Sequence, residues 1–382
     1  MDPSVIERVL NLAVNIQQIP ASTFQEHLRA KFIQQYFIEM GVKDVLLDDI
    51  GNVYALFKGR GEKPPLVVSA HLDTVFPKDT NLTILRTTEK ITGPGIGDNS
   101  LGLAGLFGLY WALCEANMGH IPIQALAGDV WLVANVSEEG LGNLVGIKAV
   151  VDRFGGDVLA YLILEGMSLG QIFHRGLGVR RYQISVLTKG GHSWVDYGDP
   201  SAIHELAELV VKIKNLDFPA EPRTSYNVGV ITGGTSVNTI AADASLQLDL
   251  RSVNPLALNK LSKQVEELVE QTNQKGGEDI HVVLEVIGER PAGEIPSDHP
   301  LVKLAKKCHS VHGLRARLNI GSTDANEPLS RGYPAICMGL TTGGGSHTIG
   351  EYIDIKPVDQ GLGILVDFVQ AVFRGNINTY VP

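Results

Sequence analysis

The stretch VVSAHLDTVFP, residues 67–77, decides how we interpret the rest of the chain. Its apolar beginning predicts a buried strand, and His71 and Asp73 come where that strand ends. Because alternate residues of a strand point to the same face, these two side chains should lie together. A carboxylate beside an imidazole can orient the ring for a metal ion, but the pair could equally cap a loop. The metal interpretation therefore depends on further ligands elsewhere in the sequence.

The composition is that of a globular protein with room for two domains. The chain has 382 residues, of which 44% are hydrophobic and 19% are charged. Its net charge of −10, without a notable lysine or arginine cluster, argues against nucleic acid or an anionic membrane as a partner. The three cysteines are scattered, so we expect reduced thiols, a cytoplasmic protein and no thiolate metal site. We expect no signal peptide, and the longest apolar run, residues 101–114, is too short to span a bilayer.

The two ends of the chain, residues 1–175 and 291–382, alternate apolar strands with helices. The spacing of apolar residues predicts helices over 3–18, 22–40, 102–116, 143–153, 299–312 and 357–373. Ser22 and Thr23 are the expected N-caps of the second helix. Expected strands cover 42–47, 53–57, 66–69, 130–136, 158–164 and 335–340, with a further extended piece over 81–92. This alternation predicts an α/β domain with a central sheet flanked by helices.

The middle of the chain, residues 176–290, follows a different pattern. Its strands alternate polar and apolar residues, which indicates a sheet with one face in solvent. The expected order is strand, helix, strand, strand, helix, strand, over 178–187, 201–213, 227–232, 244–251, 256–272 and 281–286. That order is ferredoxin-like, so one α+β domain is predicted to be inserted into the α/β domain.

Ligand-type residues gather where the strands of the outer domain end. They are His71 and Asp73, Asp98, Glu138 and Glu139, Glu165 and His347, of which five could ligate a metal. Open α/β sheets carry their sites at the carboxyl ends of strands. Two imidazoles and three carboxylates without a thiolate suit Zn²⁺, and also Mn²⁺ or Co²⁺. Five ligands exceed the three that hold one catalytic zinc, so two ions sharing a bridging carboxylate match the count better.

Each candidate also has a simpler interpretation. Asp98 could stabilise a turn with Asn99, and His347 could be a loop histidine. The doublet of Glu138 and Glu139 could be a solvated helix start. Glu165 is harder to explain in this way, because a charge that closes an apolar strand is costly unless it is paired. A ligand-type residue at the end of nearly every core strand favours a site.

Other catalytic motifs are missing from the sequence. There is no Walker A sequence and no nucleophile elbow. The glycines of residues 95–97 lack the third glycine of a dinucleotide-binding loop and do not follow a clear apolar strand. Nucleotide binding and serine hydrolase chemistry are therefore not predicted.

Several motifs together resemble the M20 metallopeptidases, the group of carboxypeptidase G2, acetylornithine deacetylase and peptidase T. They are HLDTVFP (71–77), GIGDNSLG (95–102), SEEG (137–140), LEG (164–166), GGHS (190–193) and GGSHT (344–348), with Glu351 beyond the last. They follow the order of the family over essentially the whole chain. The resemblance implies a zinc-peptidase type of central mixed sheet and hydrolysis of an amide bond in a small peptide or N-acyl amino acid.

The resemblance also implies a ligand set for two zinc ions. One ion would be held by His71, Asp98 and Glu165. Asp98 would bridge to a second ion, held also by Glu139 and His347, and the Asp98–Asn99 peptide bond would be cis.

The resemblance gives roles to the two acidic neighbours of these ligands. Asp73 would contact only His71 and orient its ring. Glu138 would be the general base, taking a proton from a metal-activated water and passing it to the leaving nitrogen.

By the same resemblance, the inserted domain would be a lid and the interface of a homodimer. His192 would reach the partner subunit's site and stabilise the oxyanion, although it could instead be a turn histidine. Asn238 and Arg251 would contact substrate, while a surface ion pair is the alternative for Arg251.

The substrate class stays open. Glu165 is a glutamate where the tripeptidase and dipeptidase branches usually have aspartate, which argues against an aminopeptidase that acts on free-amine substrates. In contrast, GSTDAN at residues 321–326 resembles the peptidase T-like members. A catalytically silent metal-binding protein on the same fold is a third hypothesis.

Overall fold

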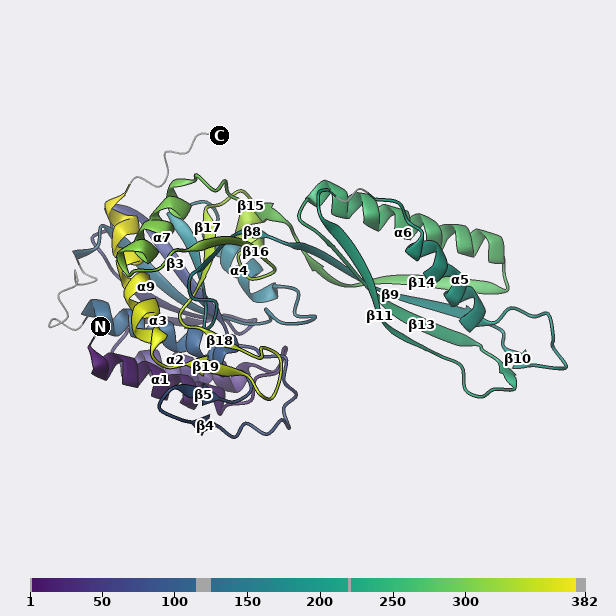
Figure 1. The fold of residues 1–382 in the computed structure, drawn as a ribbon, viewed down its shortest axis with the longest axis horizontal. Coiled ribbons are helices and arrows are strands. Elements are labelled where there is room, and N and C mark those ends of the chain that lie inside the picture. Colours follow the sequence, from purple (N-terminus) through teal and green to yellow (C-terminus); the bar gives the residue numbers. More distant parts are fainter. Residues whose placement is uncertain (1, 115–124, 219–220, 376–382) are drawn as a thin grey trace. The chain divides into compact units, whose positions relative to one another are not determined.

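The structure, a computed structural model, describes residues 2–114, 125–218 and 221–375. The chain divides into two compact units, of which the first comprises Met1–Gly176 with Gly293–Pro382 and the second Leu177–Ala292. The first unit is a mixed sheet flanked by helices, and the second is an antiparallel sheet with two helices (Figure 1). The predicted fold class, α/β with an inserted ferredoxin-like part, is confirmed.

A nine-stranded mixed sheet forms the centre of the first unit. In the order of hydrogen-bonded neighbours its strands are β1 (Asp44–Leu47), β2 (Val53–Phe57), β6 (Gly128–Asn135), β3 (Lys63–His71), β7 (Ala160–Glu165), β17 (Ala335–Gly339), β8 (Gln171–Gly176) and β15 (Gly293–Glu294), and β16 (Arg317–Gly321) also pairs with β8. The neighbours β6, β3, β7 and β17 are parallel. Their carboxyl ends therefore lie along the same edge of the sheet.

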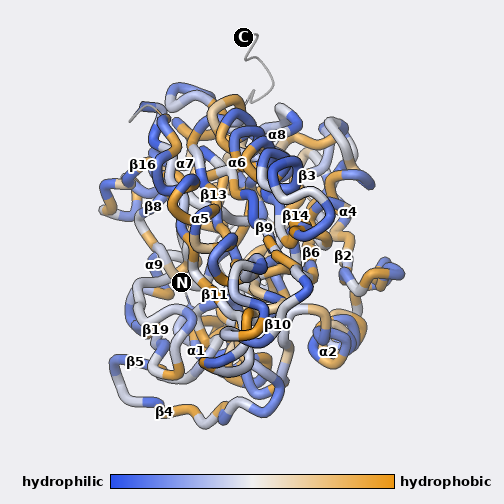
Figure 2. The backbone as a smooth tube through the Cα atoms, turned by 90° about the vertical axis from the view of Figure 1, so that its right-hand side faces the viewer, coloured by the Kyte–Doolittle hydropathy of each residue, from blue (hydrophilic) through white to orange (hydrophobic). Residues whose placement is uncertain are grey.

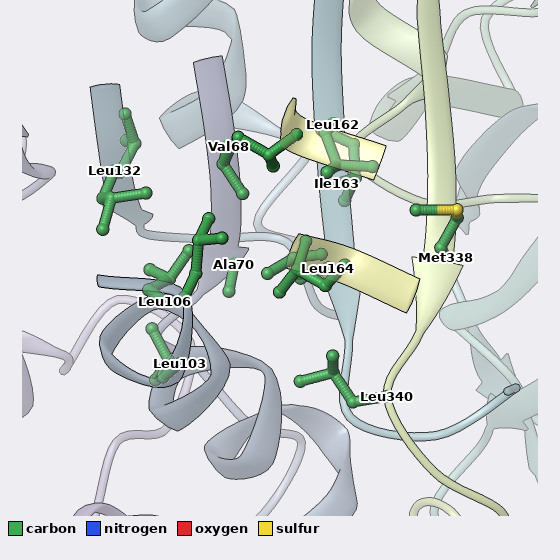
Figure 3. Close-up of a cluster of buried hydrophobic side chains, with 14 of the residues drawn as sticks. Val68, Ala70, Leu103, Leu106, Leu132, Leu162, Ile163, Leu164, Met338 and Leu340 are labelled. Atoms are coloured by element: carbon green, nitrogen blue, oxygen red, sulfur yellow. The ribbon is translucent and has the colours of Figure 1, made fainter. Parts of the chain in front are cut away.

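Helix α3 (Leu101–Cys114) is the centre of one helical layer. Nearly all its side chains are buried, because it packs on β3, β6 and β7 while α1 (Pro3–Gln17), α2 (His27–Glu39) and α9 (Pro357–Arg374) pack around it (Figure 1). In Figure 3, Leu103 and Leu106 lie against side chains from the strands, among them Val68 and Ala70. Burying one such leucine contributes about 1.5–3 kcal/mol. The last two residues of the predicted helix 102–116 lie outside the described residues.

The opposite face of the sheet carries α4 (Val145–Phe154). Trp131 of β6 contacts Phe154 of α4, with ring centroids 5.4 Å apart. Since neighbouring residues of a strand point to opposite faces, Trp131 and Leu132 pack on different layers. This explains why β6 is apolar on both faces. Two further helices of the unit are α7 (Pro300–Val311), which packs on α9, and α8 (Asn326–Ser330).

The second helix begins later than the sequence predicts. Hydrophilic and hydrophobic residues alternate along α2 (Figure 2), but it starts at His27 and has no side-chain N-cap. The Ser22 hydroxyl donates to the Phe76 carbonyl instead, and the Thr23 hydroxyl donates to Asp73. The N-cap prediction for Ser22 and Thr23 was therefore wrong, because both side chains bond to the segment that follows β3.

The second unit has the predicted ferredoxin-like order. Its elements are β9 (Gly178–Thr188), α5 (Ala202–Lys214), β11 (Thr224–Gly233), β13 (Asp243–Ser252), α6 (Pro255–Gly276) and β14 (Ile280–Arg290). The strands pair antiparallel in the order β11-β13-β9-β14, and α5 and α6 bury apolar residues against this sheet. A small two-stranded antiparallel sheet pairs β10 (Gly191–His192) with β12 (Thr239–Ile240).

The sequence analysis missed several short strands. Besides β8, β15 and β16, these include a small sheet of β18 (Gly343–Gly344), β19 (Tyr352–Asp354), β5 (Lys90–Thr92) and β4 (Leu85–Arg86). β4 and β5 replace the single extended piece expected over 81–92. Among the described residues, none of the helices combines the length and the apolar character needed to cross a membrane.

Candidate metal centre

Parallel strands bring the first candidate ligands together. His71 is the last residue of β3 and Glu165 the last of β7, and these strands are hydrogen-bonded neighbours. His71 Nε2 lies 3.1 Å from Asp98 Oδ1 and 3.7 Å from Glu165 Oε2. The candidate ligand atoms of these three residues all lie within 4.8 Å of one another.

A second cluster shares Asp98 with the first. His347 Nε2 lies 3.2 Å from Asp98 Oδ2 and 3.1 Å from Glu139 Oε1. Each oxygen of the Asp98 carboxylate thus faces a different histidine. A carboxylate in that position can bridge two cations that are held on either side of it. The ligand atoms of Asp98, Glu139 and His347 again lie within 4.8 Å.

Glu138 lies beside these two clusters. It follows β6 and is 6% exposed, as deeply buried as Glu139. A third group of candidate ligand atoms within 4.8 Å consists of His71, Glu138 and Glu139. The glutamate doublet is therefore not the solvated helix start that was kept as its alternative interpretation.

The electrostatics of the centre reflect its excess of carboxylates. Burial lowers the pKa of His71, but hydrogen bonds with Asp73, Asp98 and Glu165 outweigh burial and raise it well above 6.5. Hydrogen bonds to Asp98 and Glu139 raise the pKa of His347 to about 10. Burial and neighbouring carboxylates raise the pKa of Glu165. Without metal, His71, His347 and Glu165 therefore hold their protons tightly. Metal ions bound by the same side chains would replace these protons.

Asp73 differs from its predicted role. The ring of His71 approaches the backbone carbonyl of Asp73, with Nδ1 3.0 Å from the oxygen, while the carboxylate Oδ1 is 3.5 Å away. Because a carbonyl only accepts, Nδ1 carries the proton and Nε2 keeps its lone pair for a ligand. The backbone of Asp73 thus sets the tautomer of His71.

The Asp73 carboxylate holds the glutamate doublet. Its two oxygens accept hydrogen bonds from the backbone amides of Glu138 (2.9 Å) and Glu139 (2.8 Å), and Oδ2 also accepts from the Thr23 hydroxyl (2.9 Å). The prediction that Asp73 contacts only His71 was therefore wrong. A buried carboxylate accepts as many donors as it can reach, and the parallel strands β3 and β6 bring these amides to it.

The segment between α1 and α2 supports the same region. Arg29 is buried and donates to the carbonyls of Ile19 and Leu72. Burial lowers the pKa of Arg29 to about 10, against the opposing charges of Asp73 and Glu26. Arg29 therefore stays charged at neutral pH and offsets part of the negative charge. The sequence carried no signal for this role, because an arginine within a helix is normally exposed.

The loop that carries Asp98 is anchored to the end of β7. The Asp98–Asn99 peptide bond is cis, which confirms the expectation. Asn99 Nδ2 donates to the Leu164 carbonyl, and Asn99 Oδ1 accepts from the Gly166 amide. A Cβ on Gly166 would lie 2.1 Å from the Gly97 carbonyl oxygen, so only glycine allows this approach. The sequence analysis had considered Asn99 only as a turn residue.

Three predicted site residues belong to the second unit. His192 pairs with Thr239 in the small sheet of β10 and β12, next to Asn238. Arg251 lies near the far end of β13, roughly 30 Å from Asn238 by strand length, and its Nε donates to Asp249. The unit therefore brings His192 and Asn238 together but keeps Arg251 apart from them, in the ion pair that was its alternative interpretation.

The residues of the centre match a pair of divalent cations. Imidazole nitrogens and carboxylate oxygens converge, and the described residues supply no thiolate to these groups. Buried carboxylates this close together require positive charge between them. Zn²⁺, Mn²⁺ and Co²⁺ all accept this donor set.

Two family models match the chain. Residues 177–277 match the M20 peptidase dimerisation domain, and residues 52–169 match peptidase family M28. Among curated relatives, the acetylornithine deacetylase of Photorhabdus laumondii is 25% identical over 374 residues, or 89% of both chains.

Solved structures of peptidases share the fold. A tripeptidase from Staphylococcus aureus superposes with a TM-score of 0.81 at 23% identity, over 97% of this chain and 99% of its own. The Bacillus subtilis YXEP protein, described as a dinuclear metal-binding peptidase from the M20 family, has a TM-score of 0.68 at 18% identity, over 98% and 99%.

Together these matches support an M20 metallopeptidase. They also support a metal-dependent hydrolase of the peptidase and amidohydrolase type.

Proposed function

We propose that this M20 protein is a dinuclear zinc hydrolase that cleaves the amide bond of a small peptide or N-acyl amino acid. One observation carries the proposal: the two oxygens of Asp98 face His71 and His347, so two ligand clusters share one carboxylate. Two bound zinc ions would polarise the substrate carbonyl and make a water molecule acidic enough to lose a proton near neutral pH. Glu165 and Glu139 complete the two clusters.

Glu138 is the general base in this proposal. It is buried beside the ligands, and its backbone amide is held by Asp73. Its carboxylate would accept the proton of the attacking water and transfer it to the leaving nitrogen. Its neighbour Glu139 faces His347 and serves as a ligand. The two adjacent carboxylates therefore have separate tasks.

The inserted domain would form a homodimer and act as a lid. His192 Nδ1 accepts from the amides of Trp194 and Val195, at 3.2 Å and 3.4 Å, so Nε2 carries the proton. An exposed N–H donor of this kind suits the oxyanion of a partner subunit's substrate. Asn238 would contact substrate beside His192. Arg251 is the weaker candidate for substrate binding, because it is paired with Asp249.

The substitution Glu138→Gln tests the proposed base. It keeps the shape of the side chain but removes its ability to take a proton, so turnover should fall about 10²–10⁴-fold. The zinc content, measured by atomic emission on the purified protein, should stay at two ions per chain. Turnover near that of the wild type would contradict the assignment of Glu138, and a wild type that binds no zinc would contradict the whole proposal.

A deacylase is the second candidate. The similarity to acetylornithine deacetylase supports it, as does the glutamate at position 165. The experiment compares kcat/KM for N-acetyl amino acids with kcat/KM for dipeptides and tripeptides that have a free amine, using protein of measured zinc content. Preference for the acylated substrates favours the deacylase. The absence of hydrolysis across this panel would favour the third hypothesis, a catalytically silent metal-binding protein.

A further inference from the structure

Glu351 is a fully buried carboxylate that no step of the proposed reaction uses. Its Oε1 accepts two hydrogen bonds from consecutive backbone amides, those of Gly97 at 2.7 Å and Asp98 at 2.8 Å. Glu351 thus contacts the backbone of the bridging residue Asp98.

The same residue closes the loop that carries His347. The Glu351 carbonyl accepts from the Gly93 amide at 2.8 Å, and its own amide donates to the Thr348 carbonyl at 3.1 Å. Directly after it, β19 pairs with β5. Glu351 therefore joins two loops, residues 93–98 and 345–351, and each loop supplies one ligand to the cluster of Asp98, Glu139 and His347.

The other cluster has an anchor of its own. Asn99 connects the Asp98 loop to the end of β7, through the Leu164 carbonyl and the Gly166 amide, on either side of Glu165. His71 lies on β3 itself. Loss of the Glu351 contacts would therefore leave His71, Asp98 and Glu165 positioned, whereas His347 would lose the tie that holds its loop to Asp98.

We propose that Glu351 is a positioning residue that sets the affinity of the cluster Asp98, Glu139 and His347 for its cation. This inference rests on the two-ion function proposed above. It predicts an unequal effect: one of the two ions is bound more weakly when Glu351 is replaced, and the other is not. Residues that hydrogen-bond to metal ligands typically affect affinity 10–100-fold.

Four variants separate the possible roles of the side chain. Glu351→Gln keeps an acceptor oxygen at the same reach without the charge. Glu351→Asp keeps the charge but is one methylene too short to reach both amides, and Glu351→Ala removes both features. Glu89→Ala is the control, because Glu89 is an exposed glutamate in the turn between β4 and β5 of the same small sheet.

The experiment is a titration of each metal-free protein with Zn²⁺ by calorimetry, with Co²⁺ absorption as a second measure of site occupancy. The wild type, Glu351→Gln and Glu89→Ala should bind two ions. Glu351→Ala and Glu351→Asp should bind the first ion as the wild type does and the second about 10–100-fold more weakly. If the alanine variant does not fold, the aspartate and glutamine variants still decide the question.

If the wild type binds two ions, three results would overturn this inference and leave the two-ion function intact. They are unchanged affinities in Glu351→Asp and Glu351→Ala, an equal loss for both ions, and a glutamine variant as weak as the aspartate variant. The last would show that an acceptor oxygen within reach of the amides is not sufficient without the charge. A wild type that binds one ion would overturn the two-ion function and this inference with it.

Discussion

At the scale of single residues, Asp73 shows how one side chain organises several others. Its backbone carbonyl sets the tautomer of His71, and its carboxylate accepts the amides of Glu138 and Glu139. One residue therefore positions a ligand from β3 and two glutamates that follow β6. The general base and its neighbouring ligand depend on Asp73 even though Asp73 itself touches neither the water nor the substrate in our proposal.

Replacing Asp73 by asparagine should separate these roles. The asparagine amide can accept only one of the two backbone amides, and an unpaired buried N–H costs about 1–3 kcal/mol. We expect zinc affinity and kcat/KM to fall about 10–100-fold. Thr23→Val is the matched control, because it removes one donor to the same carboxylate but leaves both amides paired. Equal effects of the two substitutions would refute this account of Asp73.

The pH dependence of the metal-free protein should depend on His347. Its pKa is raised to about 10 in the folded protein by Asp98 and Glu139, against an ordinary value of 6.5. The folded state therefore binds this proton more tightly than the unfolded state. The resulting stability is complete below pH 6.5 and is lost as the pH rises to about 10.

His347→Gln tests this prediction. Thermal unfolding of chelator-treated wild type and variant, at several pH values between 6 and 10, should show a difference that shrinks as the pH rises. A difference that stays constant over this range would mean that the proton on His347 does not stabilise the fold.

At the scale of elements, the parallel strands place the ligands and the loops after them complete the site. The carboxyl ends of β3, β6 and β7 are neighbours, so the residues that end or follow them lie close together. The Asp98 loop is placed by a close approach to the end of β7. There the Asn99 side chain forms hydrogen bonds with the backbone of Leu164 and Gly166.

Gly166→Ala should disturb this approach. The new Cβ would meet the Gly97 carbonyl oxygen at 2.1 Å and the Leu101 Cβ at 2.9 Å, and neither backbone can move cheaply. We expect a loss of about 1–3 kcal/mol in the free energy of unfolding, measured in urea, together with reduced turnover. Gly375→Ala is the control, since its nearest neighbour would be at an ordinary 3.5 Å. A variant at Gly166 as stable and active as the control would contradict the close approach.

At the scale of the whole molecule, the inserted domain carries the remaining prediction. Sedimentation should give a homodimer, and His192→Ala should keep the dimer and its zinc while lowering kcat about 10²–10³-fold. A mixture of His192→Ala and Glu138→Ala proteins, after subunit exchange, should regain part of the activity, because the hybrid has one intact site. A fully active monomer, or a mixture without recovery, would contradict the role of His192.

The sequence by itself determined the fold class and the identity of the candidate ligands. Long apolar strands and amphipathic helices appear in sequence because each element must bury a face, and that requirement is local. The polar residues after those strands, His71, Asp98 and Glu165 among them, could be recognised for the same reason. The parallel order of β6, β3 and β7 brings His71 and Glu165 together, whereas Asp98 and His347 reach them from loops.

Only the tertiary structure decided how those ligands are held. Asp73 accepting the amides of the glutamate doublet, Thr23 bonding to Asp73 instead of capping a helix, and Glu351 joining two loops are contacts between distant parts of the sequence. Hydrogen bonds of buried polar groups are decided by which partners the packed strands and loops bring within about 3 Å, and no local pattern encodes that distance.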